Sequence, residues 1–143
     1  MRWSNIQPPK PNTPLTEMRV GTTQIDLNTK LQFIGLTWGA DDSVVTMGWA
    51  AIAEVLVVRS AQVLPLDGLA LQFAGLSRLE LAFQGREPGA LEYFELQDDP
   101  EPTLLFYFEG GTIRLAAHEC RGDLLFESDE EAEPGSEPEP PLQ

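Results

Sequence analysis

One short segment of this chain of 143 residues combines side chains that are common in nucleophilic catalysis. His118, Glu119 and Cys120 are consecutive, and they include the only histidine and the only cysteine of the sequence. On a β-strand, His118 and Cys120 would face the same side, roughly 6.5–7 Å apart along the backbone. A cysteine nucleophile needs a base within hydrogen-bond reach and a third group that orients this base. The pattern supplies no such third group, so we expect an ordinary strand end here and no catalytic residue.

Other catalytic chemistry and cofactor binding lack support from any motif. A single cysteine excludes an intramolecular disulfide and a cysteine-rich zinc site. The pairs Asp41-Asp42 and Asp98-Asp99 lack the spacing of a calcium-binding loop and are typical of turns. The chain has neither a phosphate-binding glycine loop nor a G-x-S-x-G nucleophile motif. We therefore predict no metal and no cofactor, and a small enzyme of unknown reaction is the weakest of the functions we consider.

Acidic side chains are concentrated in the second part of the chain. The sequence holds 23 acidic and 9 basic residues, which gives a net charge of −14. Seven acids and seven bases balance over residues 1–86, whereas residues 87–143 hold 16 acids and two bases. An acidic surface of this kind attracts basic proteins, while nucleic-acid binding requires clustered Lys and Arg. The charge therefore indicates a basic protein partner and argues against a nucleic acid.

Some aromatic residues in this acidic part are out of phase with the expected core. Tyr107 should point away from Phe106 and Phe108, and Tyr93 should point away from Phe94, because neighbours on a strand face opposite sides. Exposed aromatic residues among polar ones are typical of protein-binding surfaces. An alternative is that they form a second core layer in a two-sheet sandwich. The predicted partner-binding residues are Glu92, Tyr93, Glu95, Asp98, Asp99, Tyr107 and Glu109.

The elements that position these residues follow from alternation of apolar and polar side chains. This period of two, typical of half-buried strands, occurs in residues 69–74, 78–84, 103–108 and 112–118. Turn-forming residues separate these stretches at Gly75, at residues 85–89 and at Gly110-Gly111. Residues 108–112 predict a hairpin, because the two glycines can adopt positive φ without steric cost.

The first half of the chain is less regular. Residues 30–37 and 44–49 predict two strands, with a turn at residues 41–43 between them. Residues 50–59 combine helix-favouring alanines with strand-favouring valines, and we expect a strand over residues 55–59, with a short helical turn before it as an alternative. The predicted fold is mainly β: a single antiparallel sheet domain, as a sandwich, meander or open barrel, with at most one short helix.

Proline and acidic residues define the two ends. Residues 1–15 contain four prolines and predict an extended N-terminal arm, which Trp3 could anchor to the domain. Residues 16–126 form the predicted β-rich domain. Residues 127–143 hold seven acids, four prolines and no base, which predicts a disordered tail. No apolar run approaches the ~20 residues that cross a bilayer, and the start lacks a signal-peptide core, so we expect a cytoplasmic protein without a membrane partner.

The predicted C-terminal hairpin, Leu104–Ala117 followed by Cys120, resembles the ending of several small β-rich bacterial proteins, among them some immunity proteins of toxin–immunity systems. The resemblance leaves residues 1–66 unmatched. It implies a non-enzymatic inhibitor that binds a toxin through an acidic face. Our leading hypothesis is therefore an acidic protein that neutralises a basic partner, such as a toxin. The alternative is a structural or accessory component of a phage or secretion assembly. The sequence does not identify an oligomeric state.

Overall fold

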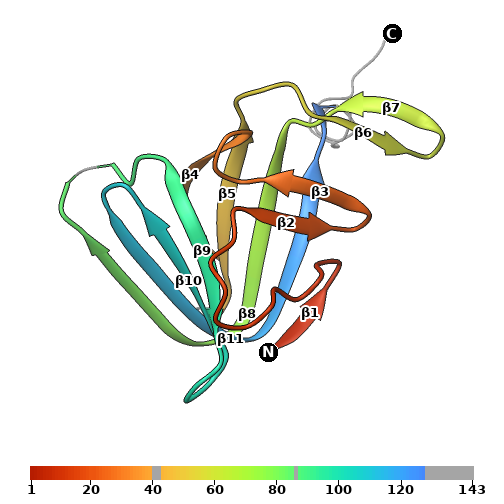
Figure 1. Ribbon diagram of the computed structural model, residues 1–143. Coiled ribbons are helices and arrows are strands. Elements are labelled where there is room, and N and C mark those ends of the chain that lie inside the picture. Colours follow the sequence, from red (N-terminus) through yellow and green to blue (C-terminus); the bar gives the residue numbers. More distant parts are fainter. Residues whose placement is uncertain (40–42, 86, 128–143) are drawn as a thin grey trace, which may run out of the picture.

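The computed structural model describes residues 1–39, 43–85 and 87–127. All eleven named elements in this part of the chain are strands, so the predicted mainly β class is confirmed. Six strands form a curled antiparallel sheet, a half-barrel, in the order β4-β5-β8-β11-β10-β9, and β1 pairs in parallel with β11 (Figure 1). The strands are β1 (Arg2–Ser4), β2 (Glu17–Val20), β3 (Thr23–Asp26), β4 (Leu31–Trp38), β5 (Val45–Ala51), β6 (Leu56–Arg59), β7 (Gln62–Pro65), β8 (Gly68–Phe83), β9 (Leu91–Gln97), β10 (Thr103–Phe108) and β11 (Gly111–Leu125).

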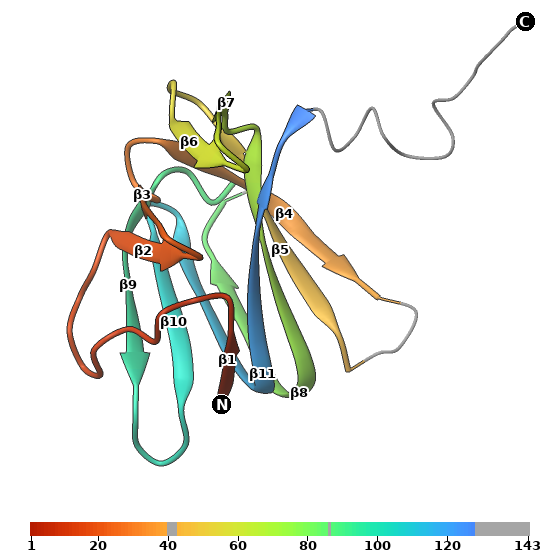
Figure 2. The same cartoon turned by 90° about the vertical axis from the view of Figure 1, so that its right-hand side faces the viewer.

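The sheet curls because its two longest strands bend at the same level. The expected turn at Gly75 is wrong: β8 continues through this residue as a single strand of 16 residues. Gly75 has φ +65°, and the pairing of β8 with β11 shifts between Ala116 and Ala117. A bulge of this kind bends a strand and increases its local twist. One half of each strand therefore belongs to the arm with β4 and β5, and the other half to the arm with β9 and β10 (Figures 1 and 2).

An aromatic core joins the two arms. The indole of Trp49 on β5 lies 6.1 Å, between ring centroids, from both Phe106 and Phe108 of β10. Phe33 of β4 also packs against Phe108, at 5.1 Å. Trp49 and Phe106 are fully buried. The alternation predicted for residues 69–74 and 103–108 is thus explained by side chains that face this shared interior.

The first 27 residues cover the concave side of the half-barrel near β9. The β2–β3 hairpin lies across this side and buries Met18, Val20 and Ile25 (Figure 1). The predicted arm of residues 1–15 lies along the domain: Trp3 packs against the core, and residues 11–15 follow the edge of β9. Neither β2 nor β3 was predicted, because four residues per strand are too few for a clear periodic pattern.

Most of the other predicted strands and the predicted hairpin are confirmed, and two predictions fall largely on residues outside the described part of the chain. Strands β4 and β5 match the expected stretches 30–37 and 44–49, and β6 matches the expected stretch 55–59 without a helical turn before it. The hairpin at residues 108–112 is confirmed, although Glu109 and Gly110 form its two-residue loop. Gly111 belongs to β11, where a Cβ would lie 2.0 Å from the carbonyl oxygen of Ala82. The predicted tail, residues 127–143, lies almost wholly outside the described residues, as does the Asp41-Asp42 turn.

Candidate protein-binding surface

All the predicted partner-binding residues lie on the antiparallel strands β9 and β10 or in the loops next to them. Phe94 and Leu96 face the core, so Tyr93 and Glu95 lie on the outer face of the sheet. Tyr107 is directly opposite Tyr93 in the register. Their rings stack with centroids 4.4 Å apart and an interplanar angle of 29°, and both side chains are partly exposed. The outward direction expected for these two tyrosines is therefore what the structure shows.

Two carboxylates lie beside this aromatic pair. Glu95 is partly exposed two residues after Tyr93, and Glu92 is exposed at the irregular step where the pairing of β9 with β10 shifts. Desolvation, a hydrogen bond to Tyr107 and the charges of Tyr107, Glu95 and Glu92 raise the pKa of the Tyr93 phenol above its ordinary value. Tyr93 therefore keeps its proton and its capacity to donate a hydrogen bond. We call these four residues (Glu92, Tyr93, Glu95 and Tyr107) the Tyr–Glu patch.

The three other predicted residues lie outside this patch. Glu109 is in the β10–β11 turn, and its carboxylate accepts a hydrogen bond from the backbone N–H of Ala90 at 3.1 Å. Asp98 and Asp99 are exposed in the loop between β9 and β10, about 17 Å along the strand from Tyr93. The hairpin therefore presents a central patch with two tyrosines and a separate acidic loop.

A row of polar side chains, which we call the polar ladder, crosses the outer face next to the patch. It consists of Gln97, Arg114, Glu80 and Arg78, and none of these was among the predicted site residues. Arg114 on β11 donates a hydrogen bond to the side-chain oxygen of Gln97 at 3.4 Å and lies 4.0 Å from a carboxylate oxygen of Glu80. Glu80 also pairs with Arg78 at 2.8 Å. Leu105 of β10, between β9 and β11, is completely buried on this face. Alternation shows that these side chains point outward, but only the strand order brings them together.

The ladder limits the extent of the acidic surface. Arg78 and Arg114 balance Glu80 over strands β8 and β11. In the described part of the chain, neither Glu92 nor Glu95 forms an ion pair. Glu92 and Glu95 of β9 therefore carry uncompensated acidic charge beside the stacked tyrosines.

His118 and Cys120 do not form a pair. The register from Ala117 to Cys120 is regular, which keeps the two side chains on one face of β11, but Cys120 is fully buried whereas His118 is exposed. His118 lies at the bend of β11 and packs against Gly75, just after the register shift between Ala116 and Ala117. Burial, with a smaller contribution from Glu119, raises the pKa of the Cys120 thiol to about 12. A protonated, buried thiol is a poor nucleophile.

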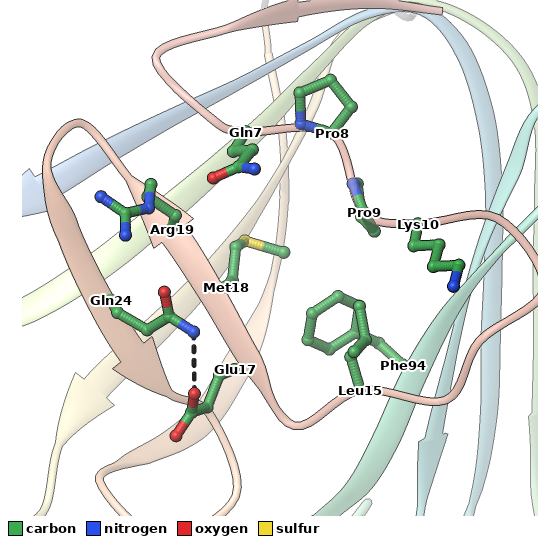
Figure 3. A pocket seen from close by; sticks show the side chains of 10 residues that line it. All are labelled: Gln7, Pro8, Pro9, Lys10, Leu15, Glu17, Met18, Arg19, Gln24 and Phe94. Atoms are coloured by element: carbon green, nitrogen blue, oxygen red, sulfur yellow. Dashed lines mark hydrogen bonds between the residues drawn. The ribbon is translucent and has the colours of Figure 1, made fainter.

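A hollow of about 380 Å³ borders the patch, where Tyr107 and Glu109 line it. Other hollows lie away from the patch. One, of about 200 Å³, lies between residues 7–10 and the β2–β3 hairpin, with Lys10 and Arg19 on opposite sides (Figure 3). Met18 and Phe94 contribute its apolar lining, and the side-chain amide of Gln24 donates a hydrogen bond to Glu17 at 2.8 Å. Across the described residues, no group of three or more His, Cys, Asp or Glu side chains is placed to hold a metal ion.

Comparison with known proteins does not assign this surface: no family model, no curated protein and no solved structure matches the chain. Among the described residues, the structure has no helix with the length and apolar character needed to cross a membrane.

Proposed function

We propose that this chain is a non-enzymatic acidic binding protein that neutralises a basic protein partner through the Tyr–Glu patch, as an immunity protein does with a bacterial toxin. The stacked pair Tyr93–Tyr107, flanked by Glu92 and Glu95, is the observation that carries the proposal. Stacked tyrosines offer a large contact area that loses little conformational entropy on binding. Carboxylates without intramolecular partners are available to Lys and Arg of another protein.

Electrostatics supports the same assignment. An acidic patch that approaches a basic cleft accelerates encounter, and the acceleration decreases as salt screens the charges. If the partner acts on a polyanion such as nucleic acid, an acidic protein in its cleft excludes that substrate by like charge. Burial of the Cys120 thiol, which keeps it protonated, leaves the alternative of a small enzyme without an available nucleophile at this position.

The test is affinity capture with the full chain from cells of its source, with two charge-reversed variants for comparison. Glu92→Lys/Glu95→Lys alters the patch, whereas Glu54→Lys/Asp67→Lys makes the same change in net charge at exposed positions elsewhere. We expect the wild type and the control variant to retain the same basic protein and the patch variant to lose it. The association rate with this protein should decrease as salt increases. Equal retention by the patch variant, or an association rate independent of salt, would refute the proposal.

A further inference from the structure

The two edges of the curled sheet differ in how they are covered. At the β9 edge, residues 11–15 form backbone hydrogen bonds with the strand: Leu15 and Phe94 exchange two, both 2.8 Å, and Asn12 donates one to Leu96. Strand β4, at the opposite edge, pairs with β5 only. In the described part of the chain, no other segment forms a backbone hydrogen bond with residues 31–38. The outward N–H and C=O groups of β4 are therefore available to another strand.

The side chains of this edge do nothing to repel a second strand. Proteins commonly protect free edges with charged residues or proline, and β4 (Leu31–Trp38) contains neither. Two large apolar side chains are exposed instead, Ile34 by 67% and Trp38 by 52%. The pairing with β5 has one irregularity, between Phe33 and Gly35, and is regular from Gly35 to Trp38. This regular run is the part of the edge that can accept a partner strand.

We propose that a second copy of this chain pairs with β4, so that two half-barrels join in one continuous antiparallel sheet. A two-fold axis perpendicular to the sheet pairs residues that lie on the same face. With the axis at Thr37, two threonines are directly opposite each other, and Leu36 is opposite Trp38 of the second copy. Leu36 and Trp38 pair with the buried residues Met47 and Val45 and so lie on the concave face. Each Trp38 would then be covered by an apolar neighbour.

The lack of charged residues along β4 favours a second copy over a basic partner or the acidic C-terminal segment. The chain carries a net charge of −14, so two copies repel each other over most of their surfaces. Along β4 they present no charge, and the described acids of residues 87–127 lie on other elements. A basic partner gains no ion pair at this edge. The acidic C-terminal segment, residues 127–143, has almost no apolar residue with which to cover Trp38. This inference does not rest on the proposed function.

Sedimentation equilibrium of the full chain over a range of concentrations and salt tests the proposal. We expect a dimer that becomes tighter as salt increases, because salt screens the repulsion between two acidic copies. Binding of a basic partner should show the opposite salt dependence, so failure of one proposal is distinguishable from failure of the other.

Two lysine variants locate the interface. Thr37→Lys places like charges opposite each other at the two-fold axis, and Thr37 is exposed, so folding should be retained. Val58→Lys on β6 is the control, because Val58 is 72% exposed and the change in net charge is the same. We expect Thr37→Lys to raise the dimer dissociation constant about fivefold and Val58→Lys to leave it unchanged. Circular dichroism confirms that both variants are folded.

Hydrogen exchange supplies a readout at the backbone. Outward amides of β4 should gain protection as the concentration of wild-type protein rises, and they should not do so in Thr37→Lys. A monomer at every concentration and salt would overturn the proposal. A dimer that persists in Thr37→Lys, or one without added protection in residues 35–38, would overturn it as well.

Discussion

Tyr93 and Tyr107 are directly opposite each other on β9 and β10, and their rings stack 4.4 Å apart on the outer face of the sheet. Their contact depends on the pairing of the two strands and on Phe94 and Phe106, which occupy the inner face beside them. The register thus brings together two side chains that are 14 positions apart in the chain and places them among carboxylates.

Tyr107→Phe should lower the pKa of Tyr93 toward the ordinary value of a tyrosine. The substitution keeps the neighbouring ring but removes the hydrogen bond and the phenolate charge, both of which raise the pKa of Tyr93. The chain has only two tyrosines, so a pH titration of phenol absorbance in this variant reports Tyr93 alone. Titration of Tyr93 at an unchanged or higher pH, with NMR used to assign the wild-type signals, would contradict the prediction.

Burial of Cys120 should lower the free energy of unfolding as pH rises through the alkaline range. Its pKa is about 12 in the folded protein and 9.0 ordinarily, so the unfolded chain loses the thiol proton first. The contribution is fully present below pH 9.0 and is lost as pH rises toward 12, because the unfolded state then binds fewer protons. Denaturant midpoints of the wild type and Cys120→Ala should therefore converge as pH increases through this range.

If the denaturant midpoints of the wild type and Cys120→Ala differ by the same amount at every pH, the thiol has the same pKa in the folded and unfolded states and the prediction is wrong. The same burial predicts that a thiol reagent modifies Cys120 only after denaturation at neutral pH. Rapid modification of the native protein would contradict this expectation.

Gly75→Ala should destabilise the bend of the sheet by about 1–3 kcal/mol. A Cβ at this position would lie 2.7 Å from the Cβ of His118, and its φ of +65° is unfavourable for alanine. Gly85→Ala is the matched control, because nothing lies within 4 Å of a Cβ there and its φ is not positive. Urea denaturation measures both. Equal stability of the two variants would mean that Gly75 does not hold the bend.

Ala61→Gly should stabilise the β6–β7 hairpin by about 0.5–1 kcal/mol. Ser60 and Ala61 form its two-residue turn with φ of +52° and +64°, a conformation that glycine adopts without steric strain. Ala53→Gly is the control, since Ala53 is not among the residues with positive φ and should lose stability. Thermal unfolding measures both changes, and a lower midpoint for Ala61→Gly would contradict the expectation.

Several features of the fold could be read from local patterns alone. Alternation over residues 69–74 and 103–108 identified side chains that are buried, such as Phe73 and Phe106, because a strand with one face on the core has a period of two. The same rule placed Tyr93 and Tyr107 outward. Composition located the acidic excess. These properties depend on neighbours in the chain, so the amino-acid sequence determines them by itself.

Long-range pairing determined the rest, and no local pattern contains it. The bulge in β8 and β11 depends on a register shift between strands some 40 residues apart in the chain, and at this bend His118 is exposed whereas Cys120 is buried. Strand order brings Arg114 to Gln97 and Glu80, so Glu80 is balanced by arginines whereas Glu92 and Glu95 of β9 are not. It also leaves β4 without a second neighbour. The sequence thus determined which side chains face outward, and only the tertiary structure decided which of them meet, because hydrogen-bonded strands are neighbours in space irrespective of their distance along the chain.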